Sequence, residues 1–569
     1  MGNVKEEEEA LNKESTEEGK GINSAQLEDV WRLVGGFGRY PALLAIFNCY
    51  ITIIVCLQQF VQTYYGSAPN FQCVPSVGNS SASTWGQSSW CPINKCGCAN
   101  CTQYVFDENE FTSAVSEWNL ICDRAHLKAM TQSVYMAGLL VGSVVFGKIS
   151  DHFGRKLTIF LSLFLMVVFG FGSAFANTLT LFAVMRFFCG MATAGCLLVR
   201  FVYSMEITNL ANRTAMGIMM NLFIVLGALT LTLIAYLVRD FRYLMLSCVL
   251  PGIPPLLLWK WIPETPPWLI AKGKLPEAQR VFESYAKLSG VKVDSDHLAG
   301  TILAVKKTQS SLTGKTGPPS IIALVKTLKL RKRNLILAYN WFVNSVVFYG
   351  ITLNARNLGG SLHLNVFILF VVGLPALLTL WVVLGRCGRR VGYCSYMMLG
   401  GLACLLVLAV PGETGDHPAI KALAVCGDFF ILATFSSVYI YTTELNPTLL
   451  RNLSLGVGSM MSRVGGIIAP YIVFLNDFMQ NLPLVVFGVM AFSAGLIALM
   501  LPETLYSPMP QTVEQAETWA EDYKLPCARF HQRKAEEVII DDEFPNEKTS
   551  NGHNDSSDEN TVGMTESTL

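Results

Sequence analysis

The sequence predicts an all-α membrane protein with twelve transmembrane helices, divided into two halves of six. Three observations predict this class: the composition, the number of long apolar segments, and the distribution of Lys and Arg between those segments. Of 569 residues, 51% are hydrophobic and 15% are charged, whereas soluble domains carry about 25% charged residues. The mean hydropathy is +0.40. This composition argues against a cytosolic enzyme, a disordered protein or a nucleic-acid binder with a basic face.

Twelve apolar segments are long enough to cross a bilayer. A helix needs about 20 apolar residues to cross a hydrocarbon core of roughly 30 Å, and lipid satisfies no backbone polar groups, so each span must be helical. The first span follows an acidic stretch, Glu6 to Glu9, so we expect no cleaved signal peptide. The expected spans are residues 40–62, 128–149, 157–177, 179–205, 215–237, 243–262, 335–355, 364–386, 392–411, 419–442, 455–475 and 483–501.

Lys and Arg gather in three loops that lie on one side of a twelve-span chain, after spans 2, 6 and 8. That side is expected to be cytosolic, because cytosolic loops carry an excess of basic residues. Both termini then lie in the cytosol, and the expected location is the plasma membrane. The expected parts are a cytosolic tail (1–39), a first six-helix half (40–262), a cytosolic loop (263–334), a second half (335–501) and a disordered tail (502–569).

One large loop on the other side, residues 63–127, is rich in cysteine. An even number of cysteines and two glycosylation sequons in one translocated loop indicate a disulfide-bonded, glycosylated cap. Six cysteines allow fifteen pairings, so the connectivity stays open. A zinc site around Cys96 to Cys101 is the alternative, although no His lies nearby. The cysteines are Cys73, Cys91, Cys96, Cys98, Cys101 and Cys122, and the sequons begin at Asn79 and Asn100.

The two halves share local features, which indicates an internal repeat. After span 2 stands GKISDHFGRK (147–156), and after span 8 stands GRCGRR (385–390). Pro-Glu-Thr follows span 6 at 263–265 and span 12 at 502–504. Glu206 ends span 4 and Glu444 ends span 10. Repeated halves with a site between them are typical of transporters.

These motifs carry a family resemblance. The stretch at 147–156 matches the G-x-x-x-D-x-x-G-R-[RK] loop of the major facilitator superfamily. The segments WNLICDR (118–124), PETPPWL (263–269) and YTTELNPT (441–448), the last followed by Arg451-Asn452, resemble those of organic cation, organic anion and carnitine transporters. The resemblance covers about residues 30–505. It implies two six-helix bundles, the major facilitator fold, with alternating access to a central cavity.

The loop motif has a physical interpretation as a gate. Gly147 and Gly154 allow close helix approach and a tight turn, and Asp151 can accept hydrogen bonds from a helix N-terminus or a neighbouring Arg. Static anchoring at the lipid headgroups is the alternative. Gly385 stands in place of the Asp in the second half, so its latch should be weaker or built differently. The expected gating and structural residues are Gly147, Asp151, Gly154, Arg155, Lys156, Arg186, Glu206, Glu264, Arg389, Glu444 and Arg451.

Charged residues inside spans are costly and usually mark a pathway or a pair. Arg463 lies about 12 Å deep in span 11 at 1.5 Å per residue, where its donor fork suits a carboxylate. Pairing with a carboxylate of a neighbouring helix is the alternative. Asp428, in span 10, could balance a substrate ammonium, carry a proton or pair with Arg186. Together, Arg463 and Asp428 suggest a site with two charges for a zwitterion.

Two more arginines lie in span 4. Arg186 is expected to be structural or coupling, because an Arg early in span 4 is common in the resembling superfamily. Arg200, six residues before Glu206, is expected to snorkel to the interface or to pair with a loop. The resemblance also bears on the substrate: Arg at 463 is typical of anion and carnitine carriers. Leu377 and Gly373 stand where anion carriers tend to have Lys and cation or carnitine carriers often have Glu.

An aromatic and polar face in span 7 completes the expected substrate site. Trp341, Asn344 and Phe348, with Ser345 beside them, fall on one helical face by their spacing. Aromatic rings can hold a quaternary amine by cation–π contact at about 0.5–2 kcal/mol. The resemblance assigns substrate contact to positions that include Phe348 and Tyr349. Ordinary bundle packing is the alternative.

The chain carries no G-x-S-x-G, P-loop or H-E-x-x-H motif, so we expect no enzyme activity, metal or cofactor. The expected function is secondary transport of small organic ions across the plasma membrane, coupled or not to Na⁺ or H⁺. Carnitine-like zwitterions are the first candidate substrates, organic anions the second and organic cations the third. A receptor that resembles a transporter is the alternative of another class. The final Ser567-Thr568-Leu569 resembles a ligand for a PDZ scaffold, and no nucleic-acid partner is expected.

Overall fold

The computed structural model describes most of the chain between residues 22 and 518. The described residues are 22–75, 93–94, 96, 101–107, 111–313, 321–410, 417–447, 450–477, 479, 481–505, 510 and 513–518. The sequons at Asn79 and Asn100, Cys91 and Cys98, and the C-terminal Ser-Thr-Leu lie outside them.

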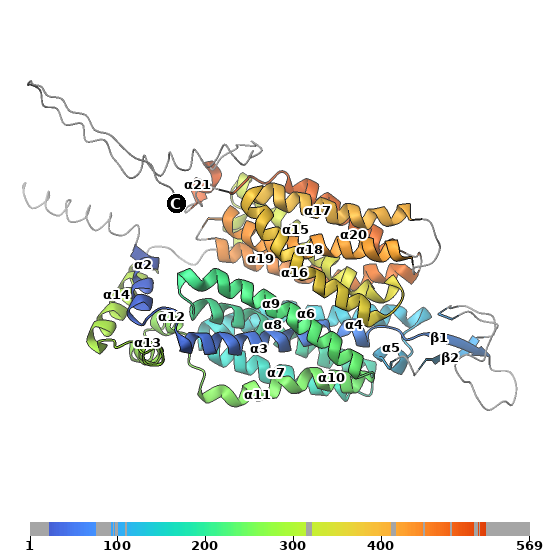
Figure 1. The fold of residues 1–569 in the computed structure, drawn as a ribbon, viewed down its shortest axis with the longest axis horizontal. Helices are drawn as coiled ribbons and strands as arrows, with labels where there is room; N and C mark the ends of the chain where they lie inside the picture. The colour runs from blue at the N-terminus through green and yellow to red at the C-terminus, as the bar shows by residue number, and fades with distance from the viewer. Residues whose placement is uncertain are drawn as a thin grey trace, which may run out of the picture. The chain divides into compact units, whose positions relative to one another are not determined.

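The first bundle contains six membrane helices, followed by a group of shorter helices (Figure 1). Its membrane helices are α3 (Arg39–Phe60), extended by α4 (Gln62–Tyr65), then α6 (Ala125–Phe153), α7 (Arg155–Ala174), α8 (Leu179–Glu206), α9 (Arg213–Leu237) and α10 (Phe241–Val249), extended by α11 (Ile253–Leu257). The shorter helices are α2 (Ile22–Leu33), α5 (Ala114–Glu117), α12 (Pro266–Ala271), α13 (Leu275–Ser289) and α14 (Ser295–Thr313).

The second bundle repeats the count of six. Its helices are α15 (Leu328–Leu353), α16 (Leu362–Arg386), α17 (Arg389–Leu405), α18 (Pro418–Leu445), α19 (Arg451–Phe474) and α20 (Leu482–Ala498), and the short α21 (Val513–Thr518) follows. Every expected span coincides with a helix of the structure. In the described part of the chain, eleven helices are long and apolar enough to cross a membrane, and α20 is a shorter apolar helix of 17 residues. The predicted all-α fold is confirmed.

The sixth expected span, 243–262, is broken rather than continuous. Helix α10 ends at Val249, a 3₁₀ turn covers Leu250–Gly252, and α11 covers Ile253–Leu257. Pro251, Pro254 and Pro255 explain the break, because proline removes a backbone donor and clashes with the preceding turn.

The loop between α4 and α6 adds a feature that the apolar pattern does not predict. Strands β1 (Phe71–Pro75) and β2 (Cys101–Phe106) pair antiparallel, with Cys73 opposite Tyr104. A disulfide joins Cys96 to Cys122 at the start of α6. Cys73 is also disulfide-bonded. We call the end of the bundles that carries this hairpin the outer end, and the end that carries α12 to α14 the inner end (Figure 1).

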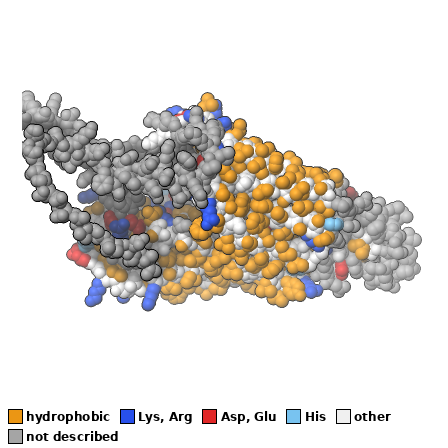
Figure 2. Space-filling model, turned by 45° about the horizontal axis from the view of Figure 1, so that its top comes forward, with side chains coloured by type: hydrophobic (Ala, Val, Ile, Leu, Met, Phe, Trp, Pro, Cys, Tyr) orange, Lys and Arg blue, Asp and Glu red, His pale blue; other side chains and the backbone are white. Residues whose placement is uncertain are grey.

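Within each bundle the helices pack closely, and the main contacts between the bundles are those of α6 with α19 and of α9 with α16, with a smaller one between α4 and α15. Hydrophobic side chains cover the flank of the helices in Figure 2, whereas Lys and Arg gather mainly toward one end. Large side chains such as Leu237, Leu378 and Trp381 are 70%, 68% and 75% exposed. An apolar flank of this extent is the surface that lipid covers in a membrane protein.

Each of the two tails contains a packed helix. In α2, Trp31 stacks on Tyr285 of α13 with ring centroids 5.7 Å apart, and its edge meets Phe282 at 5.5 Å. In α21, the carbonyl of Ala516 accepts a hydrogen bond of 2.7 Å from Arg333 of α15. These segments are ordered because apolar residues, including the fully buried Val30 and Ala516, have a surface to cover. The expectation of disorder over 502–569 is therefore wrong for 513–518, and the N-terminal tail holds an ordered helix at 22–33.

Candidate functional site

An inner-end latch in the first bundle assembles the predicted gating residues. Arg155, the first residue of α7, forms an ion pair of 3.0 Å with Glu206 at the end of α8. Glu264 accepts hydrogen bonds from the backbone N–H groups of Arg155 (2.9 Å) and Lys156 (3.1 Å). The hydroxyl of Thr265 donates to Glu206 at 2.5 Å. A carboxylate at a helix N-terminus is favourable because it meets unpaired N–H groups and the positive end of the helix dipole.

The second bundle repeats this latch. Arg389 lies 3.4 Å from Glu444, and Glu503 accepts from the N–H groups of Arg389 (2.7 Å) and Arg390 (3.0 Å). Thr504 donates to Glu444 at 2.5 Å. The sequence repeat therefore corresponds to one contact set built twice, and the two bundles are each held at their inner ends by an Arg between carboxylates.

Two glycines are required by the latch geometry. Gly154 and Gly388 precede α7 and α17 with φ values of 106° and 95°, a conformation that residues with a side chain rarely adopt. A Cβ at Gly154 would overlap the Glu264 carboxylate, and one at Gly388 would overlap that of Glu503. Glycine therefore allows each carboxylate to approach its helix N-terminus.

The latch is asymmetric at one position, as the sequence indicates. Asp151 lies 3.2 Å from Arg155 of the next helix, with its side chain 80% exposed, whereas Gly385 occupies the matching place in the second half. Gly147 lies in α6 beside Leu198, and Arg451 at the start of α19 donates to the carbonyl of Thr443 at 2.8 Å.

Burial raises the pKa of Glu264 above its ordinary value, and the hydrogen bonds from Thr265, Lys156 and Arg155 partly offset this rise.

The central site is centred on Arg463 of α19. Its guanidinium lies within electrostatic reach of the hydroxyls of Tyr349 on α15 and Tyr439 on α18. Tyr349 also accepts a hydrogen bond from the amide of Gln59 on α3, in the other bundle. The Nε of Arg463 is buried without a hydrogen-bond partner. Small residues on α19 make room here: a Cβ at Gly466 would already touch Met136 of α6 and Tyr349.

Aromatic rings from both bundles line this site. Phe348 meets Phe60 edge-on at 6.0 Å between centroids and Phe435 at 5.6 Å. Tyr439 meets Trp341 edge-on at 4.4 Å and is 44% exposed, although it lies within a membrane helix. Tyr439 and Arg463 are therefore not fully covered by the protein.

The structure separates the predicted substrate residues of α15 into two groups. Phe348 and Tyr349 lie at the boundary between the bundles. Asn344 instead lies inside the second bundle, where its amide donates to Tyr393 at 2.7 Å and its carbonyl accepts from Thr434 at 2.7 Å. Trp341 is fully buried and donates to Thr442 at 3.0 Å. The hydrogen-bonding groups of Asn344 and Trp341 are thus already occupied by the protein.

Asp428 does not pair with either Arg186 or Arg463. It is 2% exposed, and its Oδ1 has no hydrogen-bond partner. Asp428, Phe435 and Tyr439 are spaced i, i+7 and i+11 on α18, so they share one helix face, with Asp428 about 16 Å further toward the outer end than Tyr439. Of the three alternatives for Asp428, the structure does not show the pair with Arg186, which donates to the Oε1 of Gln58 at 3.3 Å and lies 4.2 Å from the ring of Tyr135.

Arg200 also differs from its expected role. It neither snorkels nor pairs with a loop carboxylate, but is 3% exposed inside the first bundle. Its Nη1 donates to Thr52 of α3 at 2.6 Å, and its Nε has no partner. Arg200 is six residues, almost two turns, from the end of α8 at Glu206, and α3 covers it on that side. Sequence distance to a helix end was therefore a poor guide to its surroundings.

The bundles touch in their outer halves. Gln59 meets Tyr349, and Ser133 of α6 donates to the carbonyl of Ile467 on α19 at 2.6 Å. Nearer the outer end, His363 of α16 lies 3.1 Å from the carbonyl of Ala235 on α9. These contacts join the two bundles on the outer side of Arg463, whereas Tyr439, nearer the inner end of α18, is 44% exposed.

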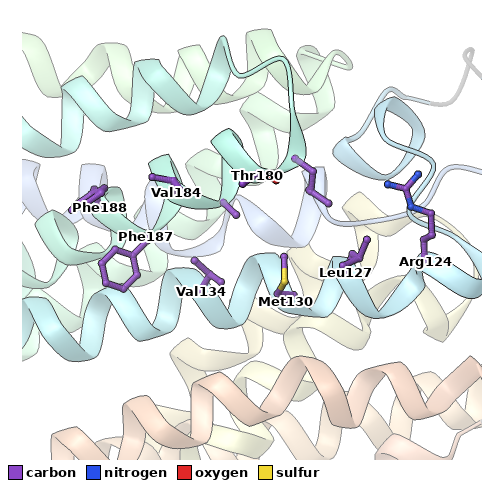
Figure 3. Close-up of a pocket in the computed structure, with 10 residues that line it drawn as sticks. Arg124, Leu127, Met130, Val134, Thr180, Val184, Phe187 and Phe188 are labelled. Carbon is purple, nitrogen blue, oxygen red and sulfur yellow. The ribbon is translucent and has the colours of Figure 1, made fainter.

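A separate groove of about 580 Å³ lies between the outer halves of α6 and α8 (Figure 3). Its lining is apolar, with Met130, Val134 and Phe187 along it and Arg124 at its outer end. Val184 and Phe188 in its wall are 44% and 36% exposed. None of the predicted substrate residues lines this groove, which belongs to the exposed apolar flank of the first bundle.

Sequence reasoning missed Tyr439 and Phe435 and assigned Arg200 to the surface. A signal for the first two was present, because they share the helix face of Asp428. The contact of Gln59 with Tyr349 could not be predicted from the sequence, because an amide near the end of an apolar helix is compatible with many surroundings. Its contact depends on how two bundles meet, which no local pattern records.

Comparison with known proteins agrees with this arrangement. Residues 80–515 match the family described as "Sugar (and other) transporter". The chain is 33% identical over 520 residues to the Drosophila melanogaster "Organic cation transporter protein", which covers 86% of this chain and 94% of that protein. It is 36% identical to "Solute carrier family 22 member 15" of Xenopus tropicalis (86% and 90% covered). It is 32% identical to the human "Organic cation/carnitine transporter 2" (72% and 73% covered).

Solved structures give the same fold. The inward open xylose transporter XylE from E. coli superposes with a TM-score of 0.58 at 15% identity, covering 85% of this chain and all of that one. Its partially occluded inward open form gives a TM-score of 0.56 at 15% identity, with 82% of this chain and 99% of that chain covered. The chain belongs to the organic cation, organic anion and carnitine transporter family of the major facilitator superfamily, and it is a secondary transporter of that type.

Proposed function

We propose that this protein carries small organic ions bearing a carboxylate across the plasma membrane, and that carnitine-like zwitterions are its preferred substrates. The observation that carries the proposal is Arg463: a half-buried guanidinium at the centre of the two bundles, with a free Nε and no carboxylate within ion-pair distance among the described residues. A buried charge without a counter-charge is unfavourable. A substrate carboxylate would supply the missing counter-charge with bidentate geometry.

The aromatic rings supply the second half of a zwitterion site. Phe348, Phe435 and Tyr439 form one chain of ring contacts, and Tyr439 lies within electrostatic reach of Arg463. Their faces can hold a quaternary ammonium at about 0.5–2 kcal/mol per contact. This arrangement needs no carboxylate beside Arg463. Asp428, higher on the same face of α18, is proposed to attract the ammonium only when the outer route is open.

The proposed transport cycle is based on the contacts between the bundles at the outer end and on the latches at the inner end. The outer contacts of Gln59, Ser133 and His363 support a state that is open toward the inner end. Opening toward the outer end requires these contacts to separate and the inner ends to approach each other. The two latches are proposed to keep each inner end rigid during this movement, because a rocking bundle must move as a unit.

The remaining expectations complete the proposal. The inner end and both termini are proposed to be cytosolic, because the basic loops lie there. The hairpin loop is proposed to be extracellular, glycosylated at Asn79 and Asn100, and stapled by disulfides among Cys73, Cys91, Cys96, Cys98, Cys101 and Cys122. The proposed partners are the lipid membrane, a coupling ion (Na⁺ or H⁺) and a PDZ scaffold at the C-terminus. Transport of organic cations is a weaker candidate, because Arg463 would repel them.

Uptake into cells that express the chain tests this proposal. Labelled carnitine, tetraethylammonium and butyrate are compared side by side, with and without external sodium. In Arg463→Ala, carnitine uptake should fall by roughly 10- to 100-fold, the range expected for a lost charge-assisted hydrogen bond. Arg280→Ala, at an exposed position of α13, is the matched control and should transport normally at equal surface abundance.

The other outcomes separate the alternatives. Uptake of butyrate but not of carnitine would replace the zwitterion by an organic anion. This second candidate has support of its own, because Arg200 adds another buried positive charge near Tyr439. Normal surface abundance with no uptake of any probe would contradict transport of these classes and favour a receptor that resembles a transporter.

A further inference from the structure

The motif segment at 118–124 ends in a charged residue, Arg124, to which the proposed function assigns no role. Arg124 is exposed and directly precedes α6, and the disulfide between Cys96 and Cys122 fixes the chain two residues before it. Among the described residues, no carboxylate lies within 4.0 Å of its guanidinium. Arg124 lines the outer end of the groove between α6 and α8 (Figure 3). Its charge is therefore available to a ligand that lies in this groove.

The groove is limited on its inner side by direct contact between the two helices. A Cβ at Gly138 of α6 would overlap the backbone carbonyl of Phe187 on α8. Further toward the outer end, α8 presents the small side chains of Thr180 and Ala183 to the groove. The hollow of about 580 Å³ extends from the helix contact to Arg124, and ligand sites in proteins typically measure about 300–1,000 Å³.

The wall of the groove is apolar and belongs to the flank that lipid covers. Val184 and Phe188 are 44% and 36% exposed. On the α6 wall, Arg124 and Val134 are ten residues apart, or about 15 Å at 1.5 Å per residue, which is half of a hydrocarbon core of roughly 30 Å. The groove thus has the length of one leaflet and places Arg124 near the headgroups. A ligand that fits it has an apolar body and an anionic group at its outer end.

We propose that this groove binds one phospholipid of the leaflet at the outer end, with an acyl chain along Met130 and Val134 and the phosphate on Arg124. A guanidinium offers a planar pair of donors that matches two phosphate oxygens, and basic residues beside membrane helices recognise lipid headgroups. The bilayer itself supplies this ligand. The inference does not depend on the proposed function, because none of the predicted substrate residues lines the groove.

Native mass spectrometry of the purified full-length chain in detergent tests the role of Arg124. Palmitoyl-oleoyl phosphatidylcholine and the corresponding diacylglycerol, which lacks the phosphate, are titrated separately. The wild type should bind the phospholipid at least about tenfold more tightly, the factor for one hydrogen bond to a charged group. Arg124→Gln should lose this preference, and Arg124→Lys, which keeps the charge without the planar fork, should keep part of it. Arg213→Gln, at the exposed first residue of α9, is the matched control and should behave as the wild type.

Photocrosslinking tests the position of the bound lipid. The chain is reconstituted into vesicles of phosphatidylcholine that carries a diazirine at the end of one acyl chain, and crosslinked peptides are identified by mass spectrometry. Crosslinks should concentrate on residues 127–134 of α6 and 180–188 of α8. Val184→Trp fills the groove and should remove most of these crosslinks. Val141→Trp, on α6 outside the groove and with a similar exposure of 42%, should leave them unchanged.

Other results would overturn the proposal. Equal affinities of the wild type for phospholipid and diacylglycerol would show that Arg124 binds no phosphate, and so would an unchanged preference in Arg124→Gln. Equal crosslinking of Val184→Trp and Val141→Trp would show that lipid covers this flank without a specific site. Displacement of the phospholipid by equimolar cholesterol or oleate would assign the groove to a different amphiphile. Arg124→Lys and Val184→Trp keep the test decisive if Arg124→Gln fails to fold.

Discussion

The amide of Gln59 donates a hydrogen bond to the hydroxyl of Tyr349, and this contact joins the two bundles beside Arg463. The same hydroxyl lies within reach of the Arg463 guanidinium. Tyr349 therefore takes part both in the contact between the bundles and in the proposed carboxylate site. A ligand that draws Arg463 away from Tyr349 would also change the contact that holds the bundles together.

Tyr349→Phe tests this double role, because it removes the hydroxyl and keeps the ring. We expect the KM for a carboxylate substrate to change by about 10- to 150-fold, in line with about 1.5–3 kcal/mol for a hydrogen bond to a charged group. Labelled uptake as a function of substrate concentration measures it. Tyr396→Phe, whose ring packs on Phe429 and Phe430 within the second bundle, should leave the KM unchanged. Equal KM values for the two variants would contradict the role of the hydroxyl.

The latch geometry predicts that Gly154→Ala destabilises the fold more than Gly273→Ala does. Gly154→Ala places a methyl group against the Glu264 carboxylate, whereas a methyl group added at Gly273, with φ of 79°, would have nothing within 4 Å of it. Both variants adopt a positive φ that residues with a side chain rarely take, at a cost of about 1–3 kcal/mol. Only Gly154→Ala should lose a further 1–3 kcal/mol, roughly, from overpacking. Unfolding midpoints of the two purified variants measure the difference, and equal midpoints would show that Glu264 can move aside freely.

Glu264 predicts a pH dependence of stability. Burial raises its pKa above the ordinary value of 4.5, so the folded protein keeps this proton to a higher pH than the unfolded chain does. The stability that Glu264 contributes is therefore greatest below pH 4.5 and falls as the pH rises through the raised pKa. Relative to Glu264→Gln, the wild type should lose stability from pH 4.5 upward. Unfolding midpoints of both proteins across that range measure this, and parallel curves would exclude a raised pKa.

The surroundings of Asp428 predict that Asp428→Asn does not destabilise the fold. Its carboxylate is buried and its Oδ1 has no partner, so Asp428→Asn keeps the shape and removes a charge that nothing nearby balances. We expect the unfolding midpoint at neutral pH to be equal to or above that of the wild type. A shift of about 2–4 °C corresponds to 1 kcal/mol in a domain of 150–250 residues, and the shift is smaller in a longer chain. A decrease of more than about 3 °C would therefore reveal a stabilising partner.

The fold was predictable because its main signals are local and repeated. Apolar length marks each membrane helix, and the latch motifs appear twice at matching places, as Arg155 with Glu206 and Arg389 with Glu444 show. The β-hairpin and the packed helix α2 were not predictable in the same way. Their stability comes from partners distant in the chain, such as Tyr285 for Trp31, and short segments carry little periodicity.

The candidate site was only partly predictable. Arg463 and Phe348 stand out as a charge and an aromatic ring inside apolar spans, and the structure brings them to the boundary of the bundles. Asn344 shares the helical face expected for substrate contact, but Tyr393 and Thr434 occupy its amide. Helical spacing fixes which side of a helix a residue faces. It does not distinguish the cavity from a neighbouring helix of the same bundle.

The docking of α2 on α13 has a practical consequence for observing the transport cycle. Trp31 and Tyr285 stack, and α13 also contacts α3, so the N-terminal segment is mechanically part of the first bundle. A spin label or fluorophore at the exposed Arg280 would therefore follow the rotation of that bundle as a whole. A second label on α21 would follow the second bundle, because Arg333 of α15 is hydrogen-bonded to Ala516 of α21. The distance between the two labels would then report how the bundles move relative to each other. Neither label would enter the membrane or touch the substrate path.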